Sequence, residues 1–334
     1  MISIEVLLTE TELATQFLAA LRERYLPEKF FYWFPLSVKA WLDLCRPQTD
    51  ATRAQGMSYR NYDRSFNLVS QHASRIASEF RRGSSLCGAE VVSLGAGQGD
   101  KDVLLLEALR ANGCDVLYRP VDASQTLLEQ ALAGAANRGF EACGLKADVA
   151  SPATAEQLLE ARSCTNDGNG DARLYLVLGN SLGVIDPLEF LRILRGLARP
   201  LDRVLFDGEI FSPQATMAGY DNPVNRRFAF SPLASVGLQE GLDGSLIFEA
   251  KADPRADGLH LVSKHFLTAR ALDIVLAGER LAFQAGEKIA MNSSYKFSHE
   301  AFLRILRESG FILQEEFLSE DERFVMVLAG PGAR

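Results

Sequence analysis

The loop Gly95-Ala96-Gly97-Gln98-Gly99 has the composition of a turn that binds a nucleotide-like cofactor. A short apolar run at 91–94 precedes it and predicts a buried parallel strand. Leucines at helical spacing follow it over 104–109. Because glycine has no Cβ, backbone N–H groups in such a strand–turn–helix unit can approach a ligand closely. We therefore predict that Gly95 and Gly97 bind a cofactor.

Acidic residues stand at the ends of the next two predicted strands. Asp122 ends a strand that begins at residue 115, and Asp148 follows a strand over 143–147. The carboxyl ends of parallel strands share one edge of a sheet, so both side chains should lie near the glycine loop. There, Asp122 would accept hydrogen bonds from ribose hydroxyls, and Asp148 from an adenine amino group. Each aspartate alone could equally cap a helix.

The loop by itself does not distinguish NAD, FAD and S-adenosylmethionine (SAM), but three features favour SAM. Asp100 occupies the place of the third glycine that a dinucleotide fold requires. The two aspartates suit an adenosyl group. Strand-like runs at 311–317 and 323–328 predict a terminal antiparallel hairpin, which is typical of class I methyltransferases.

The elements that must position these residues form an α/β pattern. Alternating strands and helices from residue 90 predict a Rossmann-like, mostly parallel sheet with helices on both faces. Apolar spacing also predicts helices before the sheet and one near the end of the chain. We expect no regular structure over 211–245 and a β-rich stretch over 246–295. The predicted strands are 91–94, 115–121, 143–147, 174–179 and 203–207; the flanking helices are 11–24, 36–45, 62–81 and 298–309.

These elements divide the chain into four predicted segments. An N-terminal helical segment is followed by the SAM-binding core, a β-rich insertion and the end of the core with its hairpin. Their limits are 1–82, 83–210, 211–296 and 297–334.

Composition narrows the range of partners. The chain of 334 residues has a net charge of −8 and no basic block, which argues against a nucleic-acid substrate. No apolar run approaches the ~20 residues that span a bilayer. The five cysteines are widely spaced and the histidines lack metal-ligand spacing. We predict a cytoplasmic protein without a metal site, a monomer or weak dimer that acts on a small molecule.

A second motif indicates different chemistry. Gly179-Asn180-Ser181-Leu182-Gly183 matches the GxSxG nucleophile elbow of serine hydrolases, and Asp207 and His299 follow in triad order. The elbow serine leads directly into a helix, whereas the helix here is predicted only after Asp186. Ser181 should then lie in an extended loop. A serine hydrolase therefore stays an alternative.

The chain resembles the ergothioneine-pathway L-histidine Nα-methyltransferases and their relatives from about residue 26 to 328. The resemblance implies a class I methyltransferase sheet with an α+β lid, formed by 1–82 and 211–296, that holds the substrate. It also implies that Gly95 and Lys101 contact the methionine part of SAM, and that Val149 joins Asp148 at the adenine. The most specific stretches are Leu94-Gly95-Ala96-Gly97, Pro120-Val121-Asp122, 178–183 before Asp186-Pro187, and Asn292-Ser293-Ser294-Tyr295-Lys296-Phe297.

The resemblance also implies a set of substrate residues. Tyr32, Tyr220 and Ser294 match family positions that hold the amino acid. With Asn292, we predict that Tyr220 and Ser294 act in catalysis by positioning the acceptor, and that Gly179 lies at both the cofactor and the substrate site.

Three substrate positions depart from the family pattern. Val184 occupies the position of an asparagine that, in the family, grips the amino acid. Asn292 occupies the position of a glutamate that faces the imidazole, and a family tyrosine falls near Thr49. Valine forms no hydrogen bond and asparagine carries no charge. Each lost charge-assisted bond costs about 1.5–3 kcal/mol. The sequence therefore predicts a SAM-dependent methyltransferase that N-methylates a small amine or amino-acid-like metabolite other than histidine.

Further alternatives remain open within SAM chemistry. The enzyme could cyclise SAM or transfer another part of it, releasing methylthioadenosine, or the chain could bind SAM without turnover. The aromatic patch at 30–34 could close the site or form a plain interdomain core.

Overall fold

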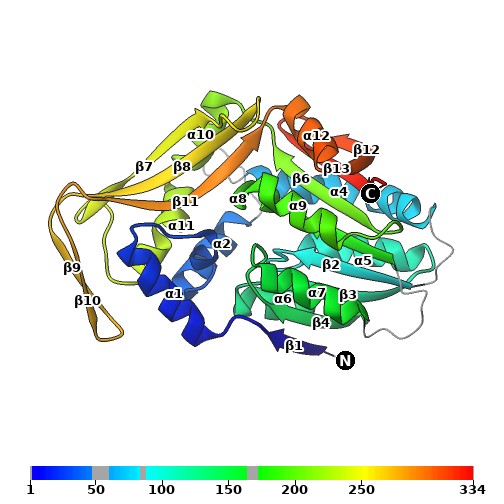
Figure 1. Cartoon of the computed structure of the whole chain (residues 1–334), viewed down its shortest axis with the longest axis horizontal. Helices are drawn as coiled ribbons and strands as arrows, with labels where there is room; N and C mark the ends of the chain where they lie inside the picture. Colours follow the sequence, from blue (N-terminus) through cyan, green and yellow to red (C-terminus); the bar gives the residue numbers. More distant parts are fainter. Residues whose placement is uncertain (1, 47–59, 83–87, 164–171, 334) are drawn as a thin grey trace.

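The computed structural model describes residues 2–46, 60–82, 88–163 and 172–333 (Figure 1). Its largest sheet has eight strands in the order β1-β4-β3-β2-β5-β6-β13-β12. The first six in this order run parallel. β13 pairs antiparallel with β6, and β12 pairs antiparallel with β13. The predicted α/β class, with a terminal antiparallel hairpin, is confirmed. The strands are β1 (Ile2–Val6), β2 (Gly88–Leu94), β3 (Asp115–Asp122), β4 (Glu141–Lys146), β5 (Ala172–Val177), β6 (Arg203–Glu209), β12 (Phe311–Leu318) and β13 (Phe324–Pro331).

Helices cover both faces of this sheet, as its parallel strands require. One apolar cluster joins the sheet to α4, α5 and α6, and a second joins the opposite face to α7, α9 and α12. The bounds are α4 (Arg60–Arg82), α5 (Asp100–Ala111), α6 (Gln125–Ala136), α7 (Pro152–Ser163), α9 (Pro187–Leu197) and α12 (His299–Glu308).

Local sequence sets where these helices begin. The hydroxyl of Ser298 accepts a hydrogen bond from the N–H of Ala301 at 3.1 Å and so caps α12. The carboxylate of Asp186 accepts from the N–H of Leu188 and Glu189, next to a proline at the first position of α9.

A lid packs beside the sheet on the left of Figure 1. We use this name for the helices and antiparallel strands that share a third apolar cluster or adjoin it. Phe30 and Phe31 lie within that cluster and are fully buried, so this part of the aromatic patch is a core. The lid consists of α1 (Glu10–Arg22), η1 (Glu28–Phe31), α2 (Pro35–Leu44), α10 (Pro213–Tyr220), α11 (Pro223–Ala234), β7 (Gly244–Ala252), β8 (Leu259–Thr268), β9 (Leu272–Leu276), β10 (Glu279–Phe283) and β11 (Lys288–Phe297).

Three features differ from the sequence predictions. The stretch 211–245 is not irregular, because Pro213 and Pro223 start the helices α10 and α11. The helix α4 falls in the predicted lid segment 1–82 but packs on the sheet through an apolar face that includes Leu68 and Ile76. The strand β1 was not predicted and adds a parallel edge beside β4.

Candidate functional site

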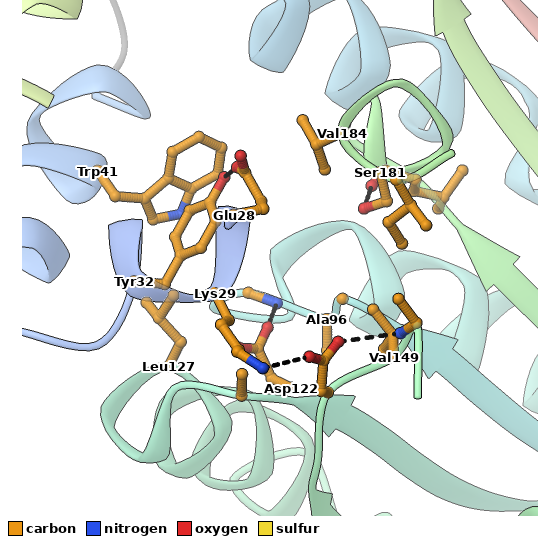
Figure 2. Close-up of a pocket in the computed structure, with 18 of the residues that line it drawn as sticks. Glu28, Lys29, Tyr32, Trp41, Ala96, Asp122, Leu127, Val149, Ser181 and Val184 are labelled. Atoms are coloured by element: carbon orange, nitrogen blue, oxygen red, sulfur yellow. Dashed lines mark hydrogen bonds and ion pairs between the residues drawn. The ribbon is translucent and has the colours of Figure 1, made fainter. Parts of the chain in front are cut away.

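A cavity of about 290 Å³ lies between the carboxyl edge of the sheet and the lid (Figure 2). Loops after β2, β3, β4 and β5 form one wall, and residues 25–41 form much of the other. All of the predicted cofactor residues line this cavity. They are Gly95, Gly97, Lys101, Asp122, Asp148, Val149 and Gly179.

The glycine loop follows β2 in the conformation that its composition predicts. Gly95 and Gly97 have φ angles of 76° and 58°, a region that other residues rarely adopt. A Cβ on Gly95 would lie only 3.0 Å from the Oγ atom of Ser181. The loop therefore needs glycine both for its turn and for its close approach to Ser181.

Asp122 connects this loop to the end of β3. Its Oδ2 atom accepts a hydrogen bond from the N–H of Gly97 at 2.9 Å, and its Oδ1 atom accepts from Ser124 at 2.8 Å. Burial raises the pKa of this carboxyl group, and the N–H donors of Ser124 and Gly97 oppose that rise. Each carboxylate oxygen has a further lone pair. Asp122 can therefore hold the loop and still accept bonds from ribose hydroxyls in the cavity.

Asp148 forms an ion pair that the sequence analysis missed. Lys29, on η1 of the lid, places its Nζ atom 2.9 Å from the Oδ2 atom of Asp148 (Figure 2). Both side chains line the cavity, so the pair joins the lid to the core beside the predicted adenine site. A lysine immediately before an aromatic run was the available signal, but nothing local identifies a partner 119 positions away.

Asp207 positions the loop that carries Gly179. Its carboxylate accepts hydrogen bonds from the N–H of Gly179 at 2.8 Å, from the N–H of Asn180 at 2.7 Å and from the hydroxyl of Ser65 at 2.5 Å. A Cβ on Gly179 would lie 3.4 Å from the Nζ atom of Lys101. The structure thus brings Gly179 and Lys101 together at the predicted methionine end.

The hydrolase alternative is wrong. Ser181 does not lie in an extended loop but begins the short helix α8 (Ser181–Val184), because Asn180 turns the chain with a φ of 66°. The Ser181 hydroxyl donates to the carbonyl of Leu178 at 2.7 Å. Asp207 holds backbone N–H groups, and the Nε2 atom of His299 lies 2.5 Å from Glu316 instead. The three residues therefore do not form a triad.

The predicted substrate residues divide into two groups. Tyr32 lines the cavity, whereas Tyr220, Asn292 and Ser294 are buried and do not belong to its described wall. Val184 also lines the cavity, opposite Tyr32 in Figure 2. Thr49 lies outside the described residues.

Two of these buried residues belong to a polar face of β11. Asn292, Ser294 and Lys296 alternate along β11 and so share its inward face. Within the described part of the chain, neither amide atom of Asn292 has a hydrogen-bond partner. The Nζ atom of Lys296 lies 3.0 Å from Glu209, whose pKa it helps to lower against the opposing effect of burial.

One acidic and one basic side chain of the lid complete the site. Glu28 lines the cavity and accepts a hydrogen bond from the hydroxyl of Tyr32 at 2.8 Å. Lys264, on β8, is only 4% exposed. Burial raises the pKa of Glu28 and lowers that of Lys264 to about 8, while each charge partly opposes the shift of the other. The sequence analysis identified neither residue.

The described ranges contain neither a cluster of metal-binding side chains nor a membrane-spanning helix. These residues contain no group of three or more His, Cys, Asp or Glu side chains that could hold a metal ion. No helix among them is both long and apolar enough to cross a bilayer.

The geometry fits an adenosyl cofactor. The cavity combines a glycine turn of positive φ with a buried carboxylate at the end of β3, and a second carboxylate follows β4. These are the groups that a ribose and an adenine require, and they lie at the carboxyl edge where open α/β sheets bind ligands.

Comparison with known proteins agrees with this geometry. Residues 54–331 match the family described as histidine-specific methyltransferase, SAM-dependent. The chain is 27% identical over 261 residues to histidine N-alpha-methyltransferase from Mycobacterium tuberculosis (strain CDC 1551 / Oshkosh), covering 72% of this chain and 76% of that protein.

Two solved methyltransferase structures also match, with low similarity. Magnesium protoporphyrin IX methyltransferase from Synechocystis PCC 6803 with bound SAH is 11% identical, with a TM-score of 0.46 over 95% of this chain and 100% of that chain. A SAM-dependent methyltransferase from Clostridium acetobutylicum ATCC 824 is 12% identical, with a TM-score of 0.41 over 80% of this chain and 92% of that chain.

The family match extends over the glycine loop, Asp122, Asp148 and the terminal hairpin. It thus includes every part of the core that shapes the cofactor side of the cavity. The chain belongs to the family of histidine-specific, SAM-dependent methyltransferases, and SAM is its cofactor.

Proposed function

We propose that this enzyme transfers the methyl group of SAM to the nitrogen of a small amine or amino-acid-like metabolite other than histidine. The observation that carries this proposal is Val184 in the wall of the cavity. The resemblance places there an asparagine that grips the histidine substrate. Since valine can neither donate nor accept a hydrogen bond, that grip is lost.

The neutral side chain of Asn292 supports the same proposal. The resemblance places a glutamate there, facing the imidazole of histidine. Asn292 carries no charge, is 2% exposed and is not among the described residues that line the cavity. A cationic ring would therefore lack the counter-charge that the resemblance places at position 292, a contact worth about 1.5–3 kcal/mol when hydrogen-bonded.

The residues of the chain act by binding and orientation. Bound SAM supplies a methyl group made electrophilic by a sulfonium. Asp122 and Asp148 would hold its adenosyl end, and Lys101 and Gly179 border the position of its methionine end. In-line transfer needs the acceptor nitrogen within about 3–3.5 Å of the methyl carbon, so these contacts fix the geometry of the reaction.

Aromatic side chains would complete the acceptor side. Tyr32 and Trp41 lie together on the lid wall, with their ring centroids 5.2 Å apart (Figure 2). Aromatic faces attract a sulfonium or an ammonium group by about 0.5–2 kcal/mol each. This wall therefore suits a cationic reacting centre.

The test is product analysis with methyl-labelled SAM. The purified enzyme is incubated with the standard amino acids and simple biogenic amines, one at a time, and the products are identified by mass spectrometry. We expect a methylated amine and S-adenosylhomocysteine in equal amounts, with histidine among the poorest acceptors.

Three outcomes would contradict the proposal. Histidine as the best acceptor would overturn the substrate assignment. Release of methylthioadenosine would replace methyl transfer by cyclisation or transfer of another group. Tight SAM binding without any product would indicate an inactive binding protein.

A further inference from the structure

Glu28 is a carboxyl group on the lid wall that the proposed reaction does not yet use. Its Oε1 atom accepts a hydrogen bond from the hydroxyl of Tyr32. Within the described residues, its buried Oε2 atom has no hydrogen-bond partner. Figure 2 shows Glu28 beside Tyr32 and Trp41, across the cavity from Val184. A side chain that lines the cavity thus carries a buried carboxylate oxygen without a hydrogen-bond partner in the described residues.

The backbone holds Glu28 at this place. The N–H of Leu26 donates to the carbonyl of Ala290 at 2.8 Å, and the N–H of Ala290 donates to the carbonyl of Arg24 at 2.8 Å. These bonds join the segment before η1 to β11. The position of Glu28 is therefore set by the lid sheet and does not depend on its own side-chain contacts.

The charged and titratable groups that face Glu28 come from several elements. Lys264 on β8 and Lys296 on β11 act on it as cations, and Tyr32 donates a hydrogen bond. Tyr25, before η1, and Tyr220, on α10, also lie within its field. The Nζ atom of Lys264 lies 5.2 Å from the centroid of the Phe31 ring, which is on η1 with Glu28. Because Lys296 pairs with Glu209 at 3.0 Å, Lys264 is a cation available to balance Glu28.

The other carboxylates near the cavity are already engaged. Asp122 holds the glycine loop, Asp148 pairs with Lys29, and Asp207 holds the loop of Gly179. Asp186 pairs with Arg255 at 2.5 Å. Among the cavity carboxylates that the structure describes, Glu28 is the one with a buried oxygen that has no hydrogen-bond partner.

We propose that Glu28 is the catalytic base that binds the acceptor amine and removes its proton, and that Lys264 is the positioning residue that keeps Glu28 ionised. This inference rests on the proposed function. The ammonium group of the acceptor gives one proton to the Oε2 atom of Glu28, which leaves a lone pair on nitrogen. That pair forms the new bond to the methyl carbon while the carbon–sulfur bond of SAM breaks, and its electrons stay on sulfur. Glu28 then releases the proton to solvent.

The main experiment compares Glu28→Gln with the wild type, using the best acceptor from the amine panel. We expect kcat to fall by about 100-fold or more, as for loss of a general base. The acidic limb of the pH profile of kcat/KM should disappear, whereas SAM affinity measured by calorimetry should stay within about twofold of the wild type. Glu23→Gln is the matched control, because Glu23 is exposed and lies outside the cavity wall.

Lys264→Met tests the positioning role. Removal of the cation should raise the pKa of Glu28 further, so the acidic limb should move to higher pH with SAM affinity unchanged. An infrared titration of the complex with S-adenosylhomocysteine gives a second readout without any acceptor. The band of Glu28 is the carboxyl band that is absent from the spectrum of Glu28→Gln. In Lys264→Met this band should titrate at higher pH than in the wild type.

The outcomes separate this inference from the proposed function. If the wild type methylates no amine in the panel, the proposed function fails, and the inference fails with it. If the wild type is active but Glu28→Gln keeps both its rate and its acidic limb, the inference alone is overturned. An unchanged infrared titration in Lys264→Met would overturn the role of Lys264. Thermal unfolding of each variant shows whether it is folded.

Discussion

Asp122 performs two tasks with one carboxylate. It accepts backbone N–H groups from the glycine loop and from the start of α6, and it lines the cavity where a ribose would lie. The backbone bonds fix the carboxylate before any cofactor arrives. Its bonds to the ribose would therefore form without the loss of side-chain entropy that a mobile carboxylate would incur.

We predict that Asp122→Asn weakens SAM binding by about 10- to 150-fold, because a charge-assisted bond contributes about 1.5–3 kcal/mol. Titration calorimetry measures this change directly. Asp115→Asn at the exposed opposite end of β3 should bind SAM like the wild type. Equal affinities for the two variants would refute the role of Asp122.

Two substitutions should move the acceptor preference toward histidine. Val184→Asn combined with Asn292→Glu restores the hydrogen-bonding groups that the resemblance places at these positions. We predict that kcat/KM for histidine rises by about tenfold or more, the equivalent of a single recovered charge-assisted bond. Steady-state assays with histidine and with the best amine of the panel check this, and SAM affinity serves as the control. No gain for histidine would show that other residues set the preference.

At the scale of elements, an ion pair attaches α4 to the turn between β12 and β13. The guanidinium group of Arg64 contacts both carboxylate oxygens of Asp321, the shortest distance being 2.5 Å. Burial tends to raise the pKa of Asp321, but hydrogen bonds from Arg64 and Ser319 outweigh it and lower the pKa to about 2. The pair thus favours the folded state while Asp321 is ionised.

We predict that Asp321→Asn lowers the free energy of unfolding at pH 7 by about 1 kcal/mol, a value reduced from the full linkage energy because the pair is partly exposed. A carboxyl group with a depressed folded pKa stabilises above its unfolded value of about 3.9 and loses that contribution as pH falls toward its folded value. The variant and the wild type should therefore converge as the pH falls from about 5 to about 2. Denaturant unfolding across this range measures the difference. A gap that persists at the lowest pH would argue against the ion pair as its cause.

The helix η1 has a comparable role on the lid. It carries Glu28 toward the acceptor and Lys29 toward Asp148, while Phe30 and Phe31 bury it in the lid core. The first two residues of this short helix thus line the cavity, and the last two pack in the lid core. The aromatic patch is core of the lid at Phe30 and Phe31 and part of the cavity wall at Tyr32.

At the scale of the whole molecule, the cavity exists only because the core and the lid meet. Its wall takes residues from η1 and α2 of the lid and from loops after four strands of the core. A ligand bound there contacts both parts. Binding should therefore stabilise the whole chain against unfolding.

We predict that S-adenosylhomocysteine at about 100 times its Kd stabilises the enzyme by about 2.7 kcal/mol, which raises Tm by several degrees. Trp41 lines the cavity, so its fluorescence should change with the same saturation curve. A Trp33→Phe background leaves Trp41 as the single tryptophan, since the chain has two. In Asp122→Asn the same concentration should raise Tm less. A ligand that alters neither Tm nor fluorescence would contradict the position of the site.

The sequence alone determined the cofactor side of this protein. The loop from Gly95 to Gly99 and the aspartates at positions 122 and 148 follow strands directly, and the carboxyl ends of parallel strands must meet at one edge. The two helices within 211–245 were missed because the prediction depended on apolar residues at helical spacing. These helices begin at prolines and do not show that spacing.

Only the tertiary structure decided the acceptor side. Lys29 pairs with Asp148, which is 119 residues away in the sequence. The charge of Lys264, on β8, acts on Glu28, on η1. Asn292 and Tyr220, which the resemblance placed against the substrate, are buried and are not among the described residues that line the cavity. The physical reason is that cofactor contacts come from backbone turns with local signatures. Acceptor contacts come from side chains that packing brings together from distant segments, and no local pattern encodes that packing.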